Sequence, residues 1–402
     1  MKKIAFLLLI LSLLSISSGC FLMFQKEKDF EKMTVDEKVE YRMKHMTLDE
    51  KIAQMLVVYY TSDTVDSNLE SILQEVKPGG FILMKENITT YDQTKKFVDD
   101  VTKDSEIPMI ISIDQEGGTV QRLKGISDVE VTNIPNMYDL GATGNLNLAY
   151  QVGKVMAEEL RTIGVNVVYA PVLDVYSNEL NTVIGKRSFS SDPQVVTDMA
   201  SELAKGLEEN GVIATYKHFP GHGDTEVDSH VNLPIVKKTY DELLNLELIP
   251  FQNAISSGAK IMMIGHIALP EITGDNTPAS LSKTIVTDTL KGKLGYQGLV
   301  ITDALNMGAL TKNYSKEEIY TQAIEAGVDL ILMPSGSKQA IEFIRKNISE
   351  ERINESVEKI LKFKYTYLGQ NNQLDKSYLG GTEHQEVVQQ IPSSEVSNDV
   401  TE

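Results

Sequence analysis

The chain has 402 residues, of which 42% are hydrophobic and 24% charged, so it can form one large domain or two to three small ones with a sizeable core. Its formal net charge of −19 argues against nucleic acid as a partner, because such binding needs a basic surface, and against loose adsorption to anionic lipid. The single cysteine excludes an intrachain disulfide.

The N-terminus has the pattern of a secretory signal. Two lysines follow Met1, residues 4–14 are apolar, and mostly small residues then lead to Cys20. The apolar run is too short to span a bilayer stably. Residues 17–20, Ser-Ser-Gly-Cys, resemble a bacterial lipoprotein cleavage box, although Ser17 replaces the usual aliphatic residue. We expect residues 1–19 to be a signal peptide and Cys20 to carry a lipid anchor; the alternative is a leftover cysteine in an ordinary signal peptide.

Residues 20–46 are rich in charge but balanced in sign, which predicts a charged spacer or an exposed helix and not a polybasic lipid clamp. Thr47 followed by Glu50 is typical of a helix N-terminus with a capping box, and apolar residues recur from there to Leu56. The pattern places the start of a folded domain at residue 47.

Between residues 47 and 368, short apolar runs alternate with helix-like segments such as 148–163 and 196–210. The runs typical of buried strands are 80–84, 109–113, 165–173, 212–216, 261–264, 299–302 and 330–333, with 54–59 as a further candidate. Seven or eight such strands predict an α/β fold, a (β/α)₈ TIM-like barrel that forms a single catalytic domain. The alternative is an open doubly wound sheet.

The composition changes after residue 368. Residues 369–402 are rich in Gln, Asn, Ser and Glu and contain one lysine. Such a segment has little apolar surface to bury, which predicts a disordered acidic tail.

Polar residues follow four of the predicted strands, at Asp114, Asp174, Lys217-His218 and Asp303. A single carboxylate at such a position is more often structural, because a buried charge must be paired. The carboxyl ends of parallel strands meet at one face of a barrel, so four such positions predict a shared polar pocket.

Residues 217–230, Lys-His-Phe-Pro-Gly-His-Gly-Asp-Thr-Glu-Val-Asp-Ser-His, contain three of the six histidines. Imidazole exchanges protons near neutral pH, and the proline and glycines indicate a loop. We interpret His222 as a structural hydrogen-bonding residue. His266 is either a pocket residue or a core histidine, and Asp174 and Glu116 either contact a ligand or order neighbouring loops.

These residues resemble glycoside hydrolase family 3 and, within it, the β-N-acetylhexosaminidases that act on bacterial cell-wall fragments. The resemblance covers about residues 46–368. It rests on four motifs in order, which are Asp114-Gln-Glu-Gly-Gly with Arg122, Gly185-Lys-Arg187-Ser-Phe189, the 217–230 stretch, and Ile301-Thr-Asp303-Ala304. It implies a (β/α)₈-like barrel, in agreement with the strand pattern.

The resemblance also implies a retaining mechanism through a covalent glycosyl-enzyme intermediate. Asp303 matches the nucleophile and His230 the acid/base, with Asp228 as the carboxylate that orients the His230 ring. In this family the acetamido group of the substrate does not serve as the nucleophile, so Asp303 is the residue expected to be labelled.

The remaining motif residues imply sugar binding. Asp114 is expected to accept hydrogen bonds from sugar hydroxyls, and donors come from Arg122, Arg187, Lys217 and His218. No cofactor or metal is implied. The expected activity is an exo-β-N-acetylglucosaminidase that releases terminal N-acetylglucosamine from peptidoglycan fragments, with the protein anchored outside the cell membrane through Cys20.

Four other functions remain open from the sequence. Some relatives with the same histidine motif are phosphorylases, and others in the family are β-glucosidases or β-xylosidases. A zinc hydrolase would use His218, His222 and His230 with Asp224 or Asp228, although their spacing fits no helical metal motif. A non-catalytic sugar-binding lipoprotein would need neither Asp303 nor His230.

Overall fold

The computed structural model describes residues 30–225, 229, 232–369 and 373–392, and the chain divides into two compact units, residues 1–46 and 47–402. In the first unit, helix α2 (Val35–His45) begins with a capping box in which the Glu37 N–H donates to the Thr34 hydroxyl and the Thr34 N–H donates to the Glu37 carboxylate. Part of the expected charged spacer is therefore helical. The predicted signal peptide and Cys20 lie outside the described residues.

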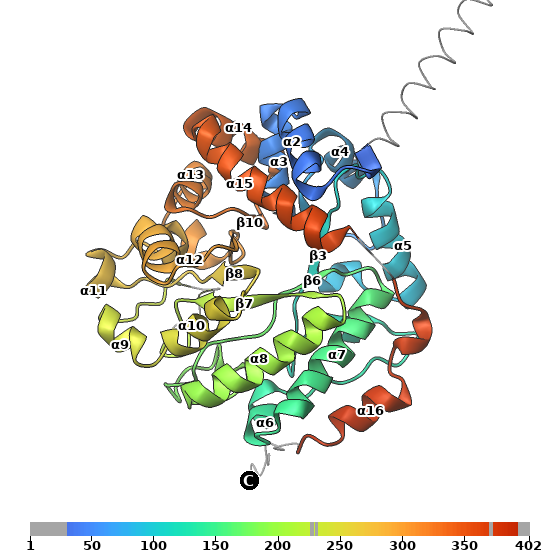
Figure 1. Ribbon diagram of the computed structural model, residues 1–402, viewed down its shortest axis with the longest axis vertical. Coiled ribbons are helices and arrows are strands. Elements are labelled where there is room, and N and C mark those ends of the chain that lie inside the picture. The colour runs from blue at the N-terminus through green and yellow to red at the C-terminus, as the bar shows by residue number, and fades with distance from the viewer. Residues whose placement is uncertain (1–29, 226–228, 230–231, 370–372, 393–402) are drawn as a thin grey trace, which may run out of the picture. The chain divides into compact units, whose positions relative to one another are not determined.

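The second unit contains a closed barrel of eight parallel strands (Figure 1) in the order β10-β1-β2-β3-β6-β7-β8-β9. The strands are β1 (Leu56–Val58), β2 (Gly80–Leu83), β3 (Ile110–Ile113), β6 (Val167–Val168), β7 (Ile213–Phe219), β8 (Ile261–Ile264), β9 (Leu299–Thr302) and β10 (Ile331–Leu332). The barrel closes where Ile301 pairs with Leu330 and the Thr302 N–H donates to the Leu330 carbonyl at 3.1 Å. The predicted (β/α)₈ barrel is confirmed, and the open sheet is wrong.

The eight strands fall on the eight predicted apolar runs, most of them slightly shorter than predicted, and β6 and β7 differ for identifiable reasons. β6 has only two residues because Pro171, soon after it, has no N–H to donate. β7 continues through Lys217 and His218, which the sequence pattern placed in a loop, because Phe219 pairs with Ile264 of β8.

Helices alternate with the strands and surround them in Figure 1. The α-helices are α3 (Leu48–Gln54), α4 (Ser67–Glu75), α5 (Tyr91–Thr102), α6 (Met137–Ala142), α7 (Leu146–Thr162), α8 (Pro193–Glu209), α9 (Tyr240–Leu244), α10 (Leu248–Ser256), α11 (Pro270–Thr273), α12 (Gly308–Thr311), α13 (Lys316–Ala326), α14 (Ser337–Asn347) and α15 (Glu350–Phe363). Shorter or wider helical turns are η1 (Lys85–Asn87), η2 (Arg122–Gly125), η3 (Gly185–Arg187), η4 (Ala279–Leu281), η5 (Thr284–Lys293) and η6 (Lys364–Leu368). Over the described ranges, no helix is long and apolar enough to cross a bilayer.

The helices pack through apolar faces at helical spacing. In α7 the side chains of Val152, Met156 and Leu160, four residues apart, are all buried. α7 approaches α8 closely at Gly153, where an added Cβ would lie 2.1 Å from the Leu203 carbonyl oxygen. A glycine is therefore required there for the two helices to pack side by side.

A short antiparallel hairpin lies outside the barrel sheet and follows β3 directly. It consists of β4 (Gln115–Gly117) and β5 (Val120–Gln121). The hairpin carries Glu116, and Arg122 follows its second strand. The sequence pattern did not predict this hairpin, which brings two charged side chains to the carboxyl ends of the barrel strands.

The prediction of a disordered tail over residues 369–402 is wrong for residues 373–392. These residues contain η7 (Lys376–Tyr378) and α16 (Thr382–Val388), and the side chains of Leu379, Val388 and Ile391 are buried. The apolar surface that the segment lacks by itself is supplied by the barrel helices, above all by α7. Residues 370–372 and 393–402 lie outside the described residues.

Lys364 is a buried cation that makes the stability of the barrel depend on pH. Its Nζ donates to the Gln54 side-chain oxygen at 2.7 Å and to the Gly79 carbonyl at 2.6 Å. Burial lowers the pKa of Lys364 to about 7. Because the folded pKa lies below that of the unfolded chain, the unfolded state binds more protons above pH 7, and stability should rise as the pH increases from 7 towards 10.

We therefore expect the difference in unfolding free energy between the wild type and Lys364→Met to shift in favour of the wild type by about 2 kcal/mol between pH 7 and pH 9. Urea denaturation of both proteins at the two pH values measures this shift. A constant difference would show that Lys364 keeps its ordinary pKa in the folded protein.

Candidate active site

Of the polar residues predicted to share a pocket, Asp114, Lys217, His218 and Asp303 line a cavity of about 320 Å³ at the carboxyl ends of the barrel strands, whereas Asp174 is fully buried and does not line it. That volume is within the range of small-molecule sites. The polar and charged residues that line it are Asp114, Glu116, Arg122, Arg187, Lys217, His218, His222, Ser229, Asp303 and Asn306. Apolar walls come from Ile82, Met84, Val120, Val183, Ile184, Met263, Ala304, Met307, Leu332 and Met333.

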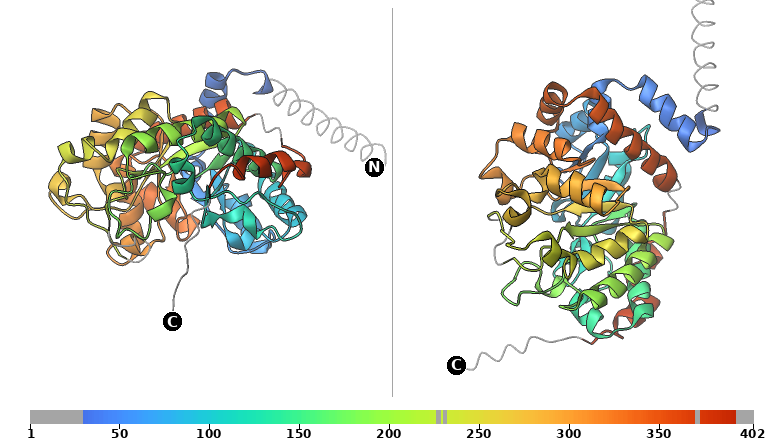
Figure 2. Two further views of the ribbon diagram at one scale, coloured as in Figure 1. Left: turned by 90° about the horizontal axis from the view of Figure 1, so that it is seen from below. Right: turned by 60° about the vertical axis from the view of Figure 1, so that its left-hand side comes forward.

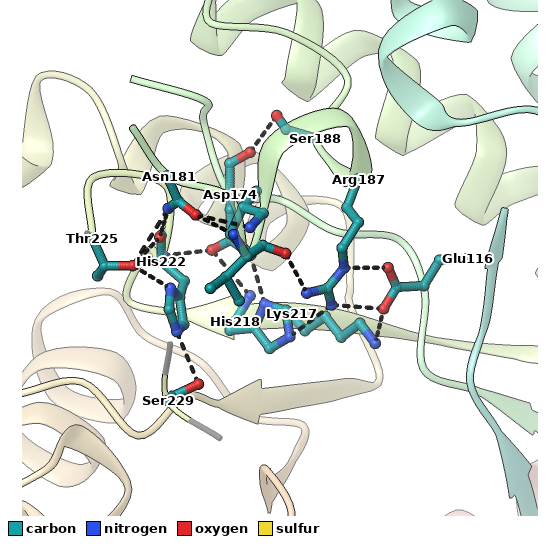
Figure 3. Close-up of polar contacts among 12 residues, drawn as sticks. Glu116, Asp174, Asn181, Arg187, Ser188, Lys217, His218, His222, Thr225 and Ser229 are labelled. Atoms are coloured by element: carbon teal, nitrogen blue, oxygen red, sulfur yellow. Dashed lines mark hydrogen bonds and ion pairs between the residues drawn. The ribbon is translucent and has the colours of Figure 1, made fainter. Parts of the chain in front are cut away.

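Glu116 is the centre of a buried ionic network (Figure 3). Its carboxylate accepts two hydrogen bonds from Arg187, from Nε at 2.7 Å and from Nη2 at 2.8 Å, and it is also paired with Lys217. Burial by itself raises the pKa of Glu116, but the charges of Arg187 and Lys217 outweigh burial and hold it well below its usual range. Glu116 is therefore an ionised anchor that orients two cations, and much of the donor capacity of Arg187 is already used by the protein.

Asp114 lies between two cations at the more open side of the cavity. Its Oδ1 is 3.1 Å from the Lys217 Nζ and its Oδ2 is 3.6 Å from the Arg122 Nη2. Burial opposes the charge of Lys217, yet Glu116 and Asp114 raise the pKa of this lysine, which stays a cation. The Arg122 Nε is buried and, among the described residues, has no hydrogen-bond partner. Asp114 and Arg122 thus keep acceptor and donor capacity for a ligand.

Asp174 organises the two histidines at the start of the loop. It is fully buried and accepts from the His218 Nδ1 at 2.6 Å and from the His222 backbone N–H at 2.6 Å. Burial raises the pKa of Asp174, but His218 and its hydrogen bonds lower it by more, so the group is ionised. The His218 Nδ1 is thereby a donor, and its Nε2, 3.4 Å from the Arg187 Nη2, is left to accept.

His222 uses both ring nitrogens for structure. Its Nδ1 contacts the Thr225 hydroxyl at 2.7 Å and its Nε2 contacts the Ser229 hydroxyl at 3.1 Å. The Asn181 side chain donates to its carbonyl oxygen at 2.7 Å. Burial, reinforced by the neighbouring His218, lowers the pKa of His222 to about 4, so the ring is neutral at physiological pH. These contacts agree with the structural role expected from the sequence.

Asp303 follows β9 and reaches into the cavity. Its backbone N–H donates to the Ile264 carbonyl at 2.9 Å, and its Oδ1 accepts from the Ala304 N–H at 2.7 Å. Burial raises the pKa of Asp303, but the neighbouring His218 and His266 and the hydrogen bond from the Ala304 N–H lower it by more. A half-buried carboxylate that is ionised and held by a backbone N–H has the properties of a nucleophile.

His266 supports the chain next to Asp303. It is fully buried, its Nδ1 is 2.8 Å from the Ser280 hydroxyl, and its Nε2 is 3.1 Å from the Ala304 carbonyl oxygen. A carbonyl oxygen can only accept, so Nε2 carries a proton and donates to it. Of the two readings that the sequence left open for His266, the structure favours a core histidine that orders the residue after Asp303.

The structure brings six of the predicted site residues together around one cavity: Asp114, Arg122, Arg187, Lys217, His218 and Asp303. Lys217 and His218 are joined by a cis peptide bond, and both side chains line the cavity. Asp228 and His230, the predicted acid/base pair, lie outside the described residues. Ser229 between them is described: it is buried, lines the cavity, and its carbonyl accepts from the Ala309 N–H at 3.1 Å.

Sequence reasoning left the roles of Glu116 and Asp174 undecided, although both are essential to the geometry of the site. Each carboxylate is buried and holds the side chains predicted to bind sugar. Their position immediately after predicted strands was a usable signal, but their partners are 71 and 44 residues away along the chain, so no local pattern identified the pairs.

Metal ligation was one of the alternatives from the sequence. Across residues 30–225, 229, 232–369 and 373–392, no group of three or more His, Cys, Asp or Glu side chains is placed to hold a metal ion. The nitrogens of His218 and His222 are directed at Asp174, Arg187, Thr225 and Ser229 instead. His230, the third histidine of that alternative, lies outside the described residues.

Residues 47–363 match the N-terminal domain of glycosyl hydrolase family 3. A β-hexosaminidase A from Pseudoalteromonas piscicida is 32% identical over 376 residues, which cover 84% of this chain and 62% of that protein. A β-hexosaminidase from Nitrosospira multiformis is 34% identical over 268 residues, covering 65% of this chain and 75% of that protein. The chain thus spans less than two thirds of the first relative and three quarters of the second.

Solved structures give the same similarity in three dimensions. A family 3 β-N-acetylglucosaminidase from Paenibacillus sp. superimposes with a TM-score of 0.79 at 36% identity, covering 86% of this chain and 68% of that one. A family 3 glycosyl hydrolase from Mycobacterium smegmatis has a TM-score of 0.73 at 28% identity, and the alignment covers 80% of this chain and 98% of that one.

Proposed function

The chain belongs to glycosyl hydrolase family 3, in its β-hexosaminidase branch, and from this premise we propose that it is a retaining exo-β-N-acetylglucosaminidase that removes terminal N-acetylglucosamine from peptidoglycan fragments. The relatives at 32–36% identity are β-hexosaminidases or a β-N-acetylglucosaminidase, which supports this sugar over glucose or xylose. The peptidoglycan substrate rests on the resemblance and on the secretory signal pattern.

The observation that carries the proposal is an ionised carboxylate, Asp303, in the same cavity as the donors Arg122, Lys217 and His218. In the first step the Asp303 carboxylate attacks the anomeric carbon, the bond to the leaving oxygen breaks, and that oxygen takes a proton from the acid/base residue. In the second step water, deprotonated by the same acid/base, attacks the anomeric carbon and releases Asp303.

We assign the acid/base role to His230 and the orienting role to Asp228. The other two carboxylates of the cavity, Asp114 and Glu116, are paired with cations, and the low pKa of Glu116 makes it a poor proton donor. No carboxylate among the described residues, apart from the nucleophile, is thus suited to donate the proton, which supports a histidine in this role. Ser229, which lines the same cavity as Asp303, is the neighbour of both residues in the sequence.

The assigned substrate-binding residues divide into two groups by the hydrogen-bonding capacity that the protein leaves unused. Asp114 and Arg122 have capacity left for sugar hydroxyls, and the His218 Nε2 and the Lys217 Nζ border the cavity. Arg187 contributes mainly by holding Glu116. A site with buried donors discriminates strongly against sugars that lack the matching group, because an unmatched donor loses its hydrogen bond.

The decisive experiment is to trap the intermediate with a 2-acetamido-5-fluoro glycosyl fluoride and to map the labelled peptide. We expect a covalent label on Asp303. A label on any other residue, or release of sugar 1-phosphate in place of free sugar when phosphate is present, would contradict the proposal. Comparing p-nitrophenyl N-acetyl-β-glucosaminide with the corresponding glucoside and xyloside tests the choice of sugar.

We also propose that the mature protein is tethered outside the cell membrane by a lipid on Cys20. The support is the signal pattern over residues 1–19 and the position of the only cysteine at the expected cleavage point. Metabolic labelling with palmitate should mark the wild type and not Cys20→Ser. Equal labelling of the two proteins, or no labelling of the wild type, would contradict the lipid anchor and would leave the proposed activity unaffected.

A further inference from the structure

The C-terminal segment, residues 373–391, lies beyond the family match at 47–363 and packs against helix α7. Figures 1 and 2 show α16 lying along the outer side of the barrel unit next to α7. Leu379, Val388 and Ile391 bury their side chains, and Lys376 lies 3.6 Å from Asp128. A segment held by so many specific contacts is an integral part of the barrel unit.

Glu159 on α7 is the central contact of this segment, and no step of the proposed reaction uses it. It is 1% exposed, and its carboxylate accepts from the Gly380 N–H at 2.9 Å and from the His384 Nδ1 at 3.2 Å. The same carboxylate accepts from the Thr132 N–H at 3.2 Å and from the Thr132 hydroxyl at 2.5 Å. Glu159 therefore ties the C-terminal segment to the loop that contains Thr132.

That loop, residues 126–136, supports the hairpin that carries part of the active site. The Ile134 N–H donates to the Gln121 side-chain oxygen at 3.0 Å, and the Gln121 side-chain nitrogen donates back to the Ile134 carbonyl at 2.8 Å. The Gly118 N–H donates to the same carbonyl at 3.0 Å. At Gly117, whose φ is +107°, an added Cβ would lie 2.5 Å from the Pro135 oxygen. The loop and the hairpin are thus in backbone contact.

The hairpin in turn positions two charged side chains of the cavity. Glu116 lies in β4 and pairs with Arg187 and Lys217, and Arg122 follows β5 and faces Asp114. A series of hydrogen bonds, joined by short stretches of backbone, therefore runs from the C-terminal segment through Glu159, Thr132 and the 126–136 loop to the sugar-binding residues.

We propose that Glu159 and His384 are positioning residues that hold the β4–β5 hairpin through the 126–136 loop, and that docking of the C-terminal segment thereby sets the affinity of the site for its sugar in a pH-dependent way. This inference rests on the proposed function only for the nature of the ligand.

The pH dependence follows from the partners of His384. Its Nδ1 faces Glu159 and its Nε2 lies 2.9 Å from Glu158, so both nitrogens donate and the ring is a cation. Burial lowers the pKa of His384, but the hydrogen bonds to Glu159 and Glu158 raise it above its usual value. The other charges nearby are Lys154, 3.8 Å from Glu158, Glu383 on α16, and Glu130, which Gln385 contacts.

The direction of this pH effect follows from the raised pKa of His384 in the folded protein. The stabilisation from His384 is complete below the unfolded pKa of about 6.5 and is lost as the pH rises through the folded value. Docking is therefore strongest at mildly acidic pH and weakens in alkaline solution, where a neutral ring faces two carboxylates.

The test compares His384→Gln and Glu159→Gln with Glu383→Gln, an exposed neighbour that serves as the control. For p-nitrophenyl N-acetyl-β-glucosaminide we expect KM to rise about 3- to 10-fold in the first two variants, with kcat within twofold of the wild type. The ratio of the KM of His384→Gln to the KM of the wild type should fall towards one as the pH rises, because titration of the active-site groups affects both proteins alike. Equal KM values for His384→Gln, Glu383→Gln and the wild type at every pH would overturn the inference.

Hydrogen exchange provides a readout that does not depend on activity. In His384→Gln, peptides from 373–391 and from 115–123 should both exchange faster, and a peptide from α14 (337–347) should not. Faster exchange confined to 373–391 would show that docking is not coupled to the hairpin. If the wild type were inactive but exchange increased in both peptides of His384→Gln, only the proposed function would be contradicted. If Glu159→Gln does not fold, His384→Gln by itself tests the inference.

Discussion

Replacing Asp303 by Asn should reduce kcat on p-nitrophenyl N-acetyl-β-glucosaminide by at least about 10⁴-fold, because the amide cannot form the glycosyl ester through which the reaction proceeds. The fold should be retained, since Asn can still accept from the Ala304 N–H as Asp303 does at 2.7 Å. Steady-state kinetics together with thermal unfolding separate the loss of chemistry from a loss of structure.

Asp288→Asn is the matched control for this substitution. Asp288 is half exposed and pairs with Lys283 at 2.8 Å on the surface, so its loss should leave kcat unchanged. Azide provides a second check, because a small anion can occupy the space left in Asp303→Ala and attack the same face of the sugar. The α-glycosyl azide should then form. Wild-type activity in Asp303→Asn would show that the nucleophile lies elsewhere.

The second large effect is expected on stability. Glu116→Gln removes the negative charge that compensates Arg187 and Lys217, two cations whose side chains are only 17% and 3% exposed. Leaving buried cations without their partner should cost about 3–5 kcal/mol of unfolding free energy. KM should also rise, because Lys217 and Arg187 border the cavity and lose the anchor that orients them. Urea denaturation and steady-state kinetics at pH 7 measure both effects.

The pH dependence of this cost has a definite sign. The folded pKa of Glu116 is lowered, so its stabilisation is present above the unfolded value of about 4.5 and is lost as the pH falls through the folded pKa. The difference between the wild type and Glu116→Gln should therefore shrink in acid. Glu75→Gln is the control, since the Glu75–Lys338 pair is about 60% exposed on both sides and should contribute little to stability. A Glu116→Gln protein as stable as this control would mean that the ionic network does not stabilise the fold.

The strand pattern was readable because each barrel strand is a short apolar run buried on both faces. Residues 261–264 and 299–302 were predicted with their observed bounds. The errors have local causes. Lys217 and His218 are polar, so they were placed after the strand, yet they belong to β7, where Lys217 pairs with Val172. Residues 373–391 are mostly polar, so they were assigned to a disordered tail, yet His384 finds both of its carboxylate partners on α7.

The candidate site, like the fold, could be predicted only in part from the sequence. Asp303 and Lys217 were identified because their residue types follow buried strands and recur in a family motif. The anchoring roles of Glu116 and Asp174 were not identified from the sequence, because each depends on a partner that only the closed barrel brings within 3 Å.

The amino-acid sequence by itself determined the eight-stranded barrel and the family and predicted which side chains react, because hydrophobic periodicity and motif spacing are properties of neighbouring residues. The tertiary structure alone decided which carboxylates are paired, which histidines are structural, and that the C-terminal segment is held on α7. These properties depend on burial and on charged residues that are far apart in the sequence. Such residues stabilise one another only after folding has brought them together in a buried site.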